Sequence, residues 1–441
     1  MKNFFETLGN IWKIKELRDR ILFTLGLLAV YRFGSFVPLP GVDEMKLMGL
    51  SEATANNGLL GLLNSFTGGA FAHAAILGLG VMPYISASIV VQLMAFAVPA
   101  LQKLQKDGES GRKQLTQITR WLTIAIAAVQ GFSYIVAIDS QYHIVADGIN
   151  MGMFYVSSVA LLVTGTMFTM WLGERITDKG VGNGVSLIIT IGIIARLPIA
   201  LAQEFTNKFT GNGAGGVIML LVEIILWLAV ILFTVMLVKG VRKIPVQYAK
   251  AVAASGQMGR QMPAGKRQYI PLKVNTAGVM PIIFAQAIMF IPGLIGGVFS
   301  DSVRMAFSDM FGLWYNVVLA VLIIAFTYLY TAIAVKTNDM ADDLKRNGGF
   351  IPGVKPGGPT ADLLDRILSL LTLPGAIALA LIAILPTFAR LAGVDTHFAS
   401  FFGGTSLLIM VGVVIDTIQQ INSYLLNRHY DGLMKTGKIK K

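Results

Sequence analysis

Long apolar segments recur throughout this chain, and they limit its possible folds more than any other feature. Ten segments are predicted to be membrane-spanning helices, near residues 20–38, 76–97, 117–138, 152–173, 184–203, 216–238, 276–296, 313–335, 368–388 and 405–426. A helix of about 20 residues crosses the hydrocarbon core of a bilayer once. Charged residues are only 14% of the 441, against about 25% in soluble domains. The chain is therefore predicted to be an all-α polytopic membrane protein.

Basic residues concentrate in alternate connecting segments. Most of the 36 Lys and Arg residues fall in the N-terminal tail, 98–120, 239–275, 336–367 and the C-terminal tail. Cytoplasmic segments carry an excess of Lys and Arg, so this pattern predicts that both termini are cytoplasmic and that the number of spans is even.

Two of these basic segments are predicted to do more than connect helices. Segment 239–275 has eight basic residues and no acidic one. It is either a strong topology signal that also attracts anionic lipid or a docking surface for a large acidic or polyanionic partner. Segment 344–367 contains GGFIPGVKPGGPTADLLDRI. Its Gly and Pro residues predict a shaped loop, with Thr360 as the N-cap of the next helix.

No catalytic or metal-binding motif is recognisable. The chain has no cysteine, and its four histidines are scattered, so we predict neither a thiol nor a metal site. The stretch GRQMPAGK at 259–266 departs from a phosphate-binding loop: five residues separate its glycines, and Arg267 stands where Ser or Thr is needed. We expect no enzymatic activity and no cofactor, and energy must come from a partner or an ion gradient.

Two acidic residues fall inside predicted spans, Glu223 and Asp416. An intramembrane carboxylate is a functional candidate, so the alternative function is a proton-coupled secondary transporter of a small solute. Against it, neither residue has an obvious basic partner or lies beside a helix break that could hold a substrate. Both could instead face a water-filled cavity or another subunit.

The stretch from Leu59 to Met94 has no charged residue, and it is too long for one span and too short for two. Gly68-Gly69, Gly78, Gly80 and Pro83 interrupt it. We therefore predict a half-length helix over about 59–75, before the second span. Such a helix is tolerated in a membrane only when protein buries it or when it lines an aqueous cavity.

Several long strings resemble the bacterial SecY family, the channel subunit of the Sec translocon. They include FTGGAFAHAAILGLGVMPYISASIVVQLM, KDGESGRKQLTQITR, MWLGERITDKGVGNGVSLI, YIPLKVNTAGVMPIIFAQAI and GGTSLLIMVGVVIDT, and the resemblance runs from about Ile21 to the C-terminus. It implies two pseudo-symmetric five-helix halves, 1–205 and 206–441, around an hourglass pore. The segment at about 59–75 would be the plug of that pore. The function implied is passage of unfolded secretory polypeptides across the bacterial inner membrane, with lateral release of transmembrane segments into the bilayer.

The resemblance also implies roles for individual residues. The pore ring would consist of Val81, Ile85, Val185, Ile189, Ile283 and Ile409. The plug would include Leu62, Leu63, Asn64, Ser65, Phe66, Thr67, Gly68, Gly69, Ala70, Phe71 and Ala72. Polar lateral-gate positions would be Gln92, Gln130 and Asn275. The surface for the SecA ATPase and the ribosome would include Arg242, Lys243, Lys250, Arg260, Lys266, Arg267, Lys345, Arg346, Lys355, Arg428 and Tyr430.

The implied partners are SecE-like and SecG-like small membrane subunits, SecA, the ribosome with its RNA, cargo polypeptides and membrane lipids. Two departures from the family pattern bear on them. Lys355 stands where the family commonly has Arg, so the charge remains but the planar fork is lost. The loop tip with Arg260, Lys266 and Arg267 is longer and richer in Gly and Met than usual, so Arg242 and Lys243 are the firmer candidates.

Overall fold

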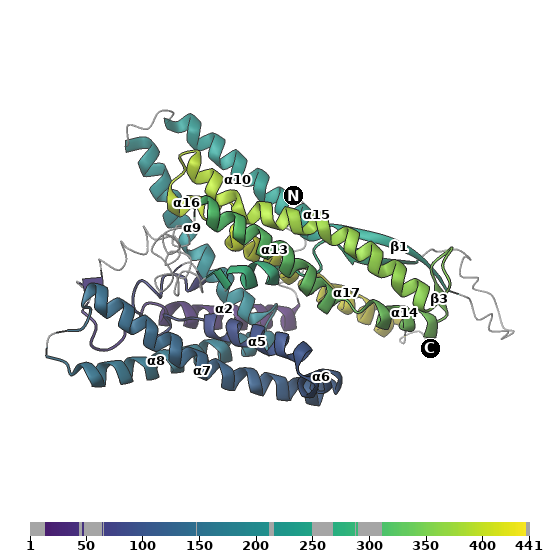
Figure 1. The fold of residues 1–441 in the computed structure, drawn as a ribbon, viewed down its shortest axis with the longest axis horizontal. Coiled ribbons are helices and arrows are strands. Elements are labelled where there is room, and N and C mark those ends of the chain that lie inside the picture. The colour runs from purple at the N-terminus through teal and green to yellow at the C-terminus, as the bar shows by residue number, and fades with distance from the viewer. Residues whose placement is uncertain are drawn as a thin grey trace.

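Long helices in two groups make up most of the structure, with a small sheet at one end (Figure 1). The computed structural model describes residues 14–43, 46–47, 64, 66–146, 148–210, 216–248, 268–286, 288–289 and 311–437. The first group contains α2 (Lys15–Gly34), α5 (Met82–Ala97), α6 (Pro99–Lys106), α7 (Gly108–Tyr142) and α8 (Met151–Lys179). The second contains α10 (Gly216–Lys239), α13 (Leu313–Ala334), α14 (Thr337–Arg346), α15 (Gly358–Leu391), α16 (Thr396–Ala399) and α17 (Gly404–Gly437). Helix α9 (Gly184–Thr210) packs against members of both groups.

The predicted spans correspond to helices α2, α5, α7, α8, α9, α10, α13, α15 and α17. The span predicted at 276–296 is helical at 280–286 and 288–289, and its remaining C-terminal part lies outside the described residues. Among the described residues, seven helices are long and apolar enough to cross a membrane, or eight if the bent pair α5–α6 is one span. The chain is thus a multi-pass membrane protein, and the count of ten stays a prediction.

Two predicted boundaries are wrong, each for a local reason. The second span was expected from residue 76, but residues 77–81 form turns, and α5 begins only at Met82. Gly80 has a left-handed φ of +53°, and Pro83 lies in the first turn of α5, where a proline is tolerated. Helix α15 begins at Gly358, so Thr360 lies inside its first turn and is not the N-cap. Its hydroxyl instead donates to the Lys355 carbonyl at 2.9 Å.

The fold is not purely helical, because the two basic segments contribute a three-stranded sheet. Strand β1 (Val241–Tyr248) pairs antiparallel with β2 (Gln268–Lys273) and with β3 (Gly349–Phe350), in the order β2-β1-β3. Ile244 and Val246 alternate with exposed residues and are buried, which is the period-two pattern of a strand with one covered face. Apolar runs of span length dominate the sequence and obscure so short a pattern.

Each group of helices has its own apolar core, and a third core lies between them. The first contains Tyr134 and Ile135 of α7 with Leu162 of α8. The second contains Leu319 of α13 and Leu379 of α15. The third, called here the central cluster, draws residues from α2, α8, α9 and α17, and it is where the predicted site falls.

Candidate functional site

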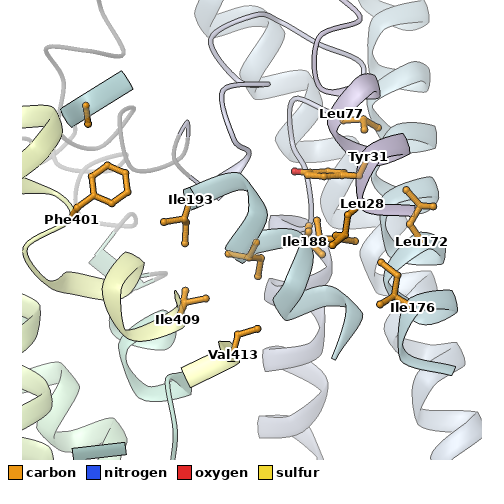
Figure 2. Packing of buried hydrophobic residues seen from close by; sticks show 13 residues of the cluster. Leu28, Tyr31, Leu77, Leu172, Ile176, Ile188, Ile193, Phe401, Ile409 and Val413 are labelled. Atoms are coloured by element: carbon orange, nitrogen blue, oxygen red, sulfur yellow. The ribbon is translucent and has the colours of Figure 1, made fainter. Parts of the chain in front are cut away.

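The central cluster brings all six predicted ring residues together. Val81, Ile189 and Ile409 are buried in it. Ile85, Val185 and Ile283 are half-buried and pack against it. Figure 2 shows the cluster, with Ile193 beside Phe401 and Ile409, and Ile188 beside Leu28. Residues more than 300 positions apart in the sequence therefore share one apolar contact region.

All six side chains are branched and aliphatic, and none can donate or accept a hydrogen bond. A narrow constriction lined by such side chains excludes water and ions by dewetting. It also contacts any passing side chain without a preference for polar groups. A sealed but non-selective constriction is what this chemistry supports.

Residues 64 and 66–75, called here the plug segment, lie against the central cluster through Phe66. The structure contradicts the prediction of a helix here: after Asn64 and Phe66, residues 67–74 form turns. Gly68 and Gly69 have φ of +65° and +99°, a region that L-residues with a side chain rarely adopt. The Asn64 side chain accepts from the Ala72 backbone N–H at 3.0 Å. Leu62, Leu63 and Ser65 lie outside the described residues.

Three side chains from neighbouring helices hold the plug segment through its carbonyl groups. The Tyr134 hydroxyl on α7 donates to the Phe71 carbonyl at 2.7 Å. The Tyr31 hydroxyl on α2 donates to the Thr67 carbonyl at 3.4 Å, and the Arg32 guanidinium donates to the Gly68 carbonyl. Sequence reasoning missed all three. Arg32 offered a signal, because a cation near the end of a predicted span needs a partner.

Helix α9 also approaches the plug segment closely. A Cβ added at Gly68 would lie 2.8 Å from the Cα of Gly192. The two backbones therefore touch, and only glycine allows this approach on both sides. The α9 helix thus carries two of the predicted ring residues and contacts the plug segment one turn further along.

Among the described residues, no hydrogen bond joins the predicted gate residues to one another. Gln92 on α5 donates to the Ser88 hydroxyl at 3.1 Å, within its own helix. Gln130 on α7 is exposed. Asn275 is buried, and within the described part of the chain its Oδ1 has no hydrogen-bond partner.

The predicted docking residues that the structure describes lie on adjoining elements. Arg242 and Lys243 are exposed on β1, Lys345 and Arg346 are exposed at the end of α14, and Lys355 is exposed in the following loop. Strand β3 contacts both β1 and α14, and Figure 1 shows these elements at one end of the molecule. Lys250, Arg260, Lys266 and Arg267 lie outside the described residues, as do the side chains of Arg428 and Tyr430 on α17.

One argument used against the transporter alternative is wrong. Glu223 does have a basic partner, because the Lys208 Nζ lies 2.9 Å from its Oε1. Asp416 is exposed on α17, and no contact among the described residues joins it to Glu223. Across the same described ranges, no group of three or more His, Cys, Asp or Glu side chains is placed to hold a metal ion.

Comparison with known proteins decides the family. The SecY family profile matches residues 75–418. The chain belongs to the SecY family. The protein translocase subunit SecY of Chlamydia trachomatis is 38% identical over 458 aligned residues, covering 98% of this chain and 99% of the relative. The corresponding subunit of Escherichia coli K12 is 39% identical, covering 96% of this chain and 95% of the relative.

Solved structures share the SecY fold of this chain at low sequence identity. One, described as the structure of a protein conducting channel, has a TM-score of 0.61 at 17% identity and covers 92% of this chain and 91% of its own. Another, described as Sec61 in the canine ribosome-channel complex from the endoplasmic reticulum, has a TM-score of 0.57 at 15% identity, with the same coverage of both chains. Identity this low establishes the shared fold alone.

Proposed function

We propose that this SecY-family chain is the central protein-conducting channel of a Sec translocon in a bacterial inner membrane. One observation carries the proposal: six branched aliphatic residues from four parts of the chain meet in the central cluster, against which the plug segment packs. Unfolded secretory polypeptides would cross through this ring, and transmembrane segments would leave sideways into the bilayer. Both termini and the three-stranded sheet would be cytoplasmic.

The ring and the plug segment would seal the closed pore together. The aliphatic ring excludes water because it offers hydrated ions no polar contact. The plug segment is held by hydrogen bonds to three of its carbonyl groups and by the packing of Phe66 and Phe71. Bonds of this kind are individually modest in net energy, so a polypeptide entering the ring could displace the segment without unfolding the surrounding helices.

Lateral release would use the apolar character of the cargo itself. A segment of about 20 apolar residues is more stable in hydrocarbon than in an aqueous pore. We infer that Gln92, Gln130 and Asn275 flank the exit. Interhelical polar contacts in membranes are worth only about 0.6–2 kcal/mol, which suits a gate that must open repeatedly.

The exposed basic residues of the sheet and α14 would bind the partner that drives transport. Arg242, Lys243, Lys345, Arg346 and Lys355 present five cations on adjoining elements, which favours an acidic protein surface or RNA phosphates. SecA would bind here during post-translational transport, and the ribosome during synthesis. SecE-like and SecG-like subunits would cover part of the apolar outer surface, with lipid on the remainder. The chain itself would then need no catalytic group.

Reconstitution tests the proposal. The purified chain with its co-purifying small subunits is placed in vesicles, SecA and ATP are added, and protease protection of a signal-bearing preprotein is measured. ATP-dependent protection is expected. A deletion of residues 62–72 should in addition raise the resting ion conductance, because it removes much of the plug segment. No protection and no binding of SecA would contradict the channel proposal.

The transporter alternative is tested in the same vesicles. Glu223→Gln combined with Asp416→Asn removes both intramembrane carboxylates. Loss of preprotein transport with normal SecA binding and an unchanged resting conductance would favour proton coupling. We expect transport to persist, because neither Glu223 nor Asp416 belongs to the central cluster.

A further inference from the structure

Helix α9 links the two groups of helices, and a proline divides it. Pro198 lies inside the helix. Proline lacks the N–H that would bond to the carbonyl four residues earlier, and its ring crowds that carbonyl. Sharp bends in helices occur at such positions. The inner segment, residues 184–197, and the outer segment, residues 199–210, are therefore weakly coupled to each other.

The inner segment packs in the central cluster and against the plug segment. It carries the ring residues Val185 and Ile189, and Gly192 touches the backbone of the plug segment at Gly68. Ile188 and Ile193 pack in the central cluster with Leu28 and Tyr31 of α2. Movement of this segment therefore alters the ring and the plug segment directly.

The outer segment is fastened to the C-terminal group of helices by buried charges. Lys208 lies 2.9 Å from Glu223 Oε1 on α10 and 3.5 Å from Glu204 Oε1 on its own helix. The side chains of Glu204, Lys208 and Glu223 are 1%, 14% and 3% exposed, respectively. These three residues are called here the clasp. Figure 1 shows the end of α9 beside α10 and α16 at one corner of the molecule.

Backbone groups of the α15–α16 connection complete the clasp. The Asp395 N–H donates to Glu204 Oε2 at 2.8 Å. Lys208 donates to the Gly393 carbonyl at 3.0 Å. Asn207 donates to the Asp395 carboxylate at 3.1 Å. The outer segment is thus joined to two parts of the C-terminal group, α10 and the α15–α16 connection, within about two helical turns.

Apolar packing follows the same division at Leu201, although the neighbouring Ala200 of the outer segment is buried in the central cluster. Leu201 packs against a cluster that contains Val394, Phe398 and Phe402, together with Trp227 of α10. The indole of Trp227 also donates to the Phe401 carbonyl at 2.9 Å. Every member of that cluster except Leu201 follows residue 205 in the sequence.

We propose that the two halves of the channel are hinged inside α9, at Pro198, and that Glu204, Lys208 and Glu223 fasten the outer segment of α9 to the C-terminal half. This places the mechanical boundary before residue 199, not between residues 205 and 206 as the sequence predicted. When the halves separate, the outer segment moves with α10 and α16 while the inner segment remains with α2 and α8. The inference rests on the proposed channel function.

Distance measurements between spin labels test the hinge. The chain has no natural cysteine, so pairs can be introduced into the full chain with its small subunits. One pair joins the exposed Gln203 on the outer segment to Leu391 at the end of α15. The other joins Gln203 to Met153 on α8, and Leu391 and Met153 are 79% and 76% exposed. Each distance is measured at rest and with a preprotein arrested in the channel by a folded fusion domain, SecA and ATP.

The hinge predicts that the Gln203–Leu391 distance stays constant while the Gln203–Met153 distance changes by more than the width of its distribution. The reverse pattern would place the boundary beyond residue 203 and overturn the hinge. Constant distances for both pairs, with the preprotein protected from protease, would overturn it as well. Failure to engage a preprotein at all is detected separately by the protease assay and contradicts the channel function itself.

The clasp has a test that does not depend on transport. Lys208→Met leaves two buried carboxylates without their cation, so the resting Gln203–Leu391 distribution should broaden. The matched control is Lys113→Met, because Lys113 pairs with Glu109 at 3.0 Å on the exposed start of α7. That control should leave the distribution unchanged. An equally narrow distribution in the Lys208→Met variant would refute the clasp whatever the channel does.

Discussion

Replacing Tyr134 with Phe should make the plug segment leave its resting position more often. The hydroxyl of Tyr134 donates to the Phe71 carbonyl at 2.7 Å, and the Tyr134 side chain is buried. The two rings, whose centroids lie 4.7 Å apart, remain in contact after the substitution. The change therefore removes one hydrogen bond and little packing.

The size of the effect follows from the buried carbonyl. Leaving a buried acceptor unsatisfied costs about 1–3 kcal/mol. The displaced segment is hydrated, so this cost falls on the closed state alone. The equilibrium between seated and displaced segment should shift by about 5- to 160-fold toward displacement. Arg32→Met should shift it in the same direction, because its bond to the Gly68 carbonyl is charge-assisted.

Single-channel recording in planar bilayers measures the effect as the frequency of spontaneous openings without SecA or preprotein. Tyr155→Phe on α8 is the matched control. That hydroxyl also donates at 2.7 Å, but its acceptor is the carboxylate of Asp139 on α7 and not a carbonyl of the plug segment. The control should leave the resting frequency unchanged. Equal frequencies in Tyr134→Phe, Arg32→Met and the unmodified chain would refute the idea that these carbonyl contacts set the resting state.

The remaining predictions concern packing, docking and the contact between the two halves. Gly165→Ala should greatly reduce the amount of folded protein, because a Cβ there would collide with the Ile76 carbonyl oxygen. The control Gly131→Ala should be tolerated, because a Cβ there would make only ordinary contacts at 3.6 Å. Thermal unfolding of the purified variants measures both effects, and equal melting temperatures would contradict this packing. Arg242→Glu with Lys243→Glu should weaken binding of SecA or the ribosome most at low salt, where such contacts are least screened, and unchanged affinity there would exclude β1 from the docking surface. Gln420→Leu removes the acceptor that binds the Gly182 N–H at 2.9 Å and should destabilise the closed state by about 1 kcal/mol. The channel should then open at a lower preprotein concentration. If the variant and the unmodified chain open at the same preprotein concentration, this bond does not hold the halves together.

Hydropathy predicted most of the helices because it reports a local property. An apolar run of span length has few alternatives in a membrane other than a helix, whatever it packs against. The break before the second span was also readable, since Gly80 and Pro83 act on their own backbone. The start of α15 was misplaced by three residues, because Thr360 was chosen as the N-cap whereas Gly357 holds that position. The strands were missed because β1 is stabilised by hydrogen bonds to β2 and β3, which follow much later in the sequence.

Physical reasoning on the sequence did not single out the ring. An isoleucine in a membrane span ordinarily faces lipid or a neighbouring helix, so only the family resemblance pointed to Ile85, Ile189 or Ile409. The structure places these residues in one apolar cluster, and the ring itself stays a proposal. The resemblance could name positions, but it could not say what holds the plug segment.

By itself the sequence determined the membrane class, most of the helices and the family, since each depends on runs of neighbouring residues. Only the tertiary structure decided which polar groups meet. Lys208 pairs with Glu223 across two helices, and Tyr134 reaches a carbonyl 63 residues away. Such pairs depend on how the helices cross in space, and the periodicity of the sequence does not predict those crossings. The plug contacts and the clasp at the end of α9 are therefore properties of the fold that single residues do not reveal.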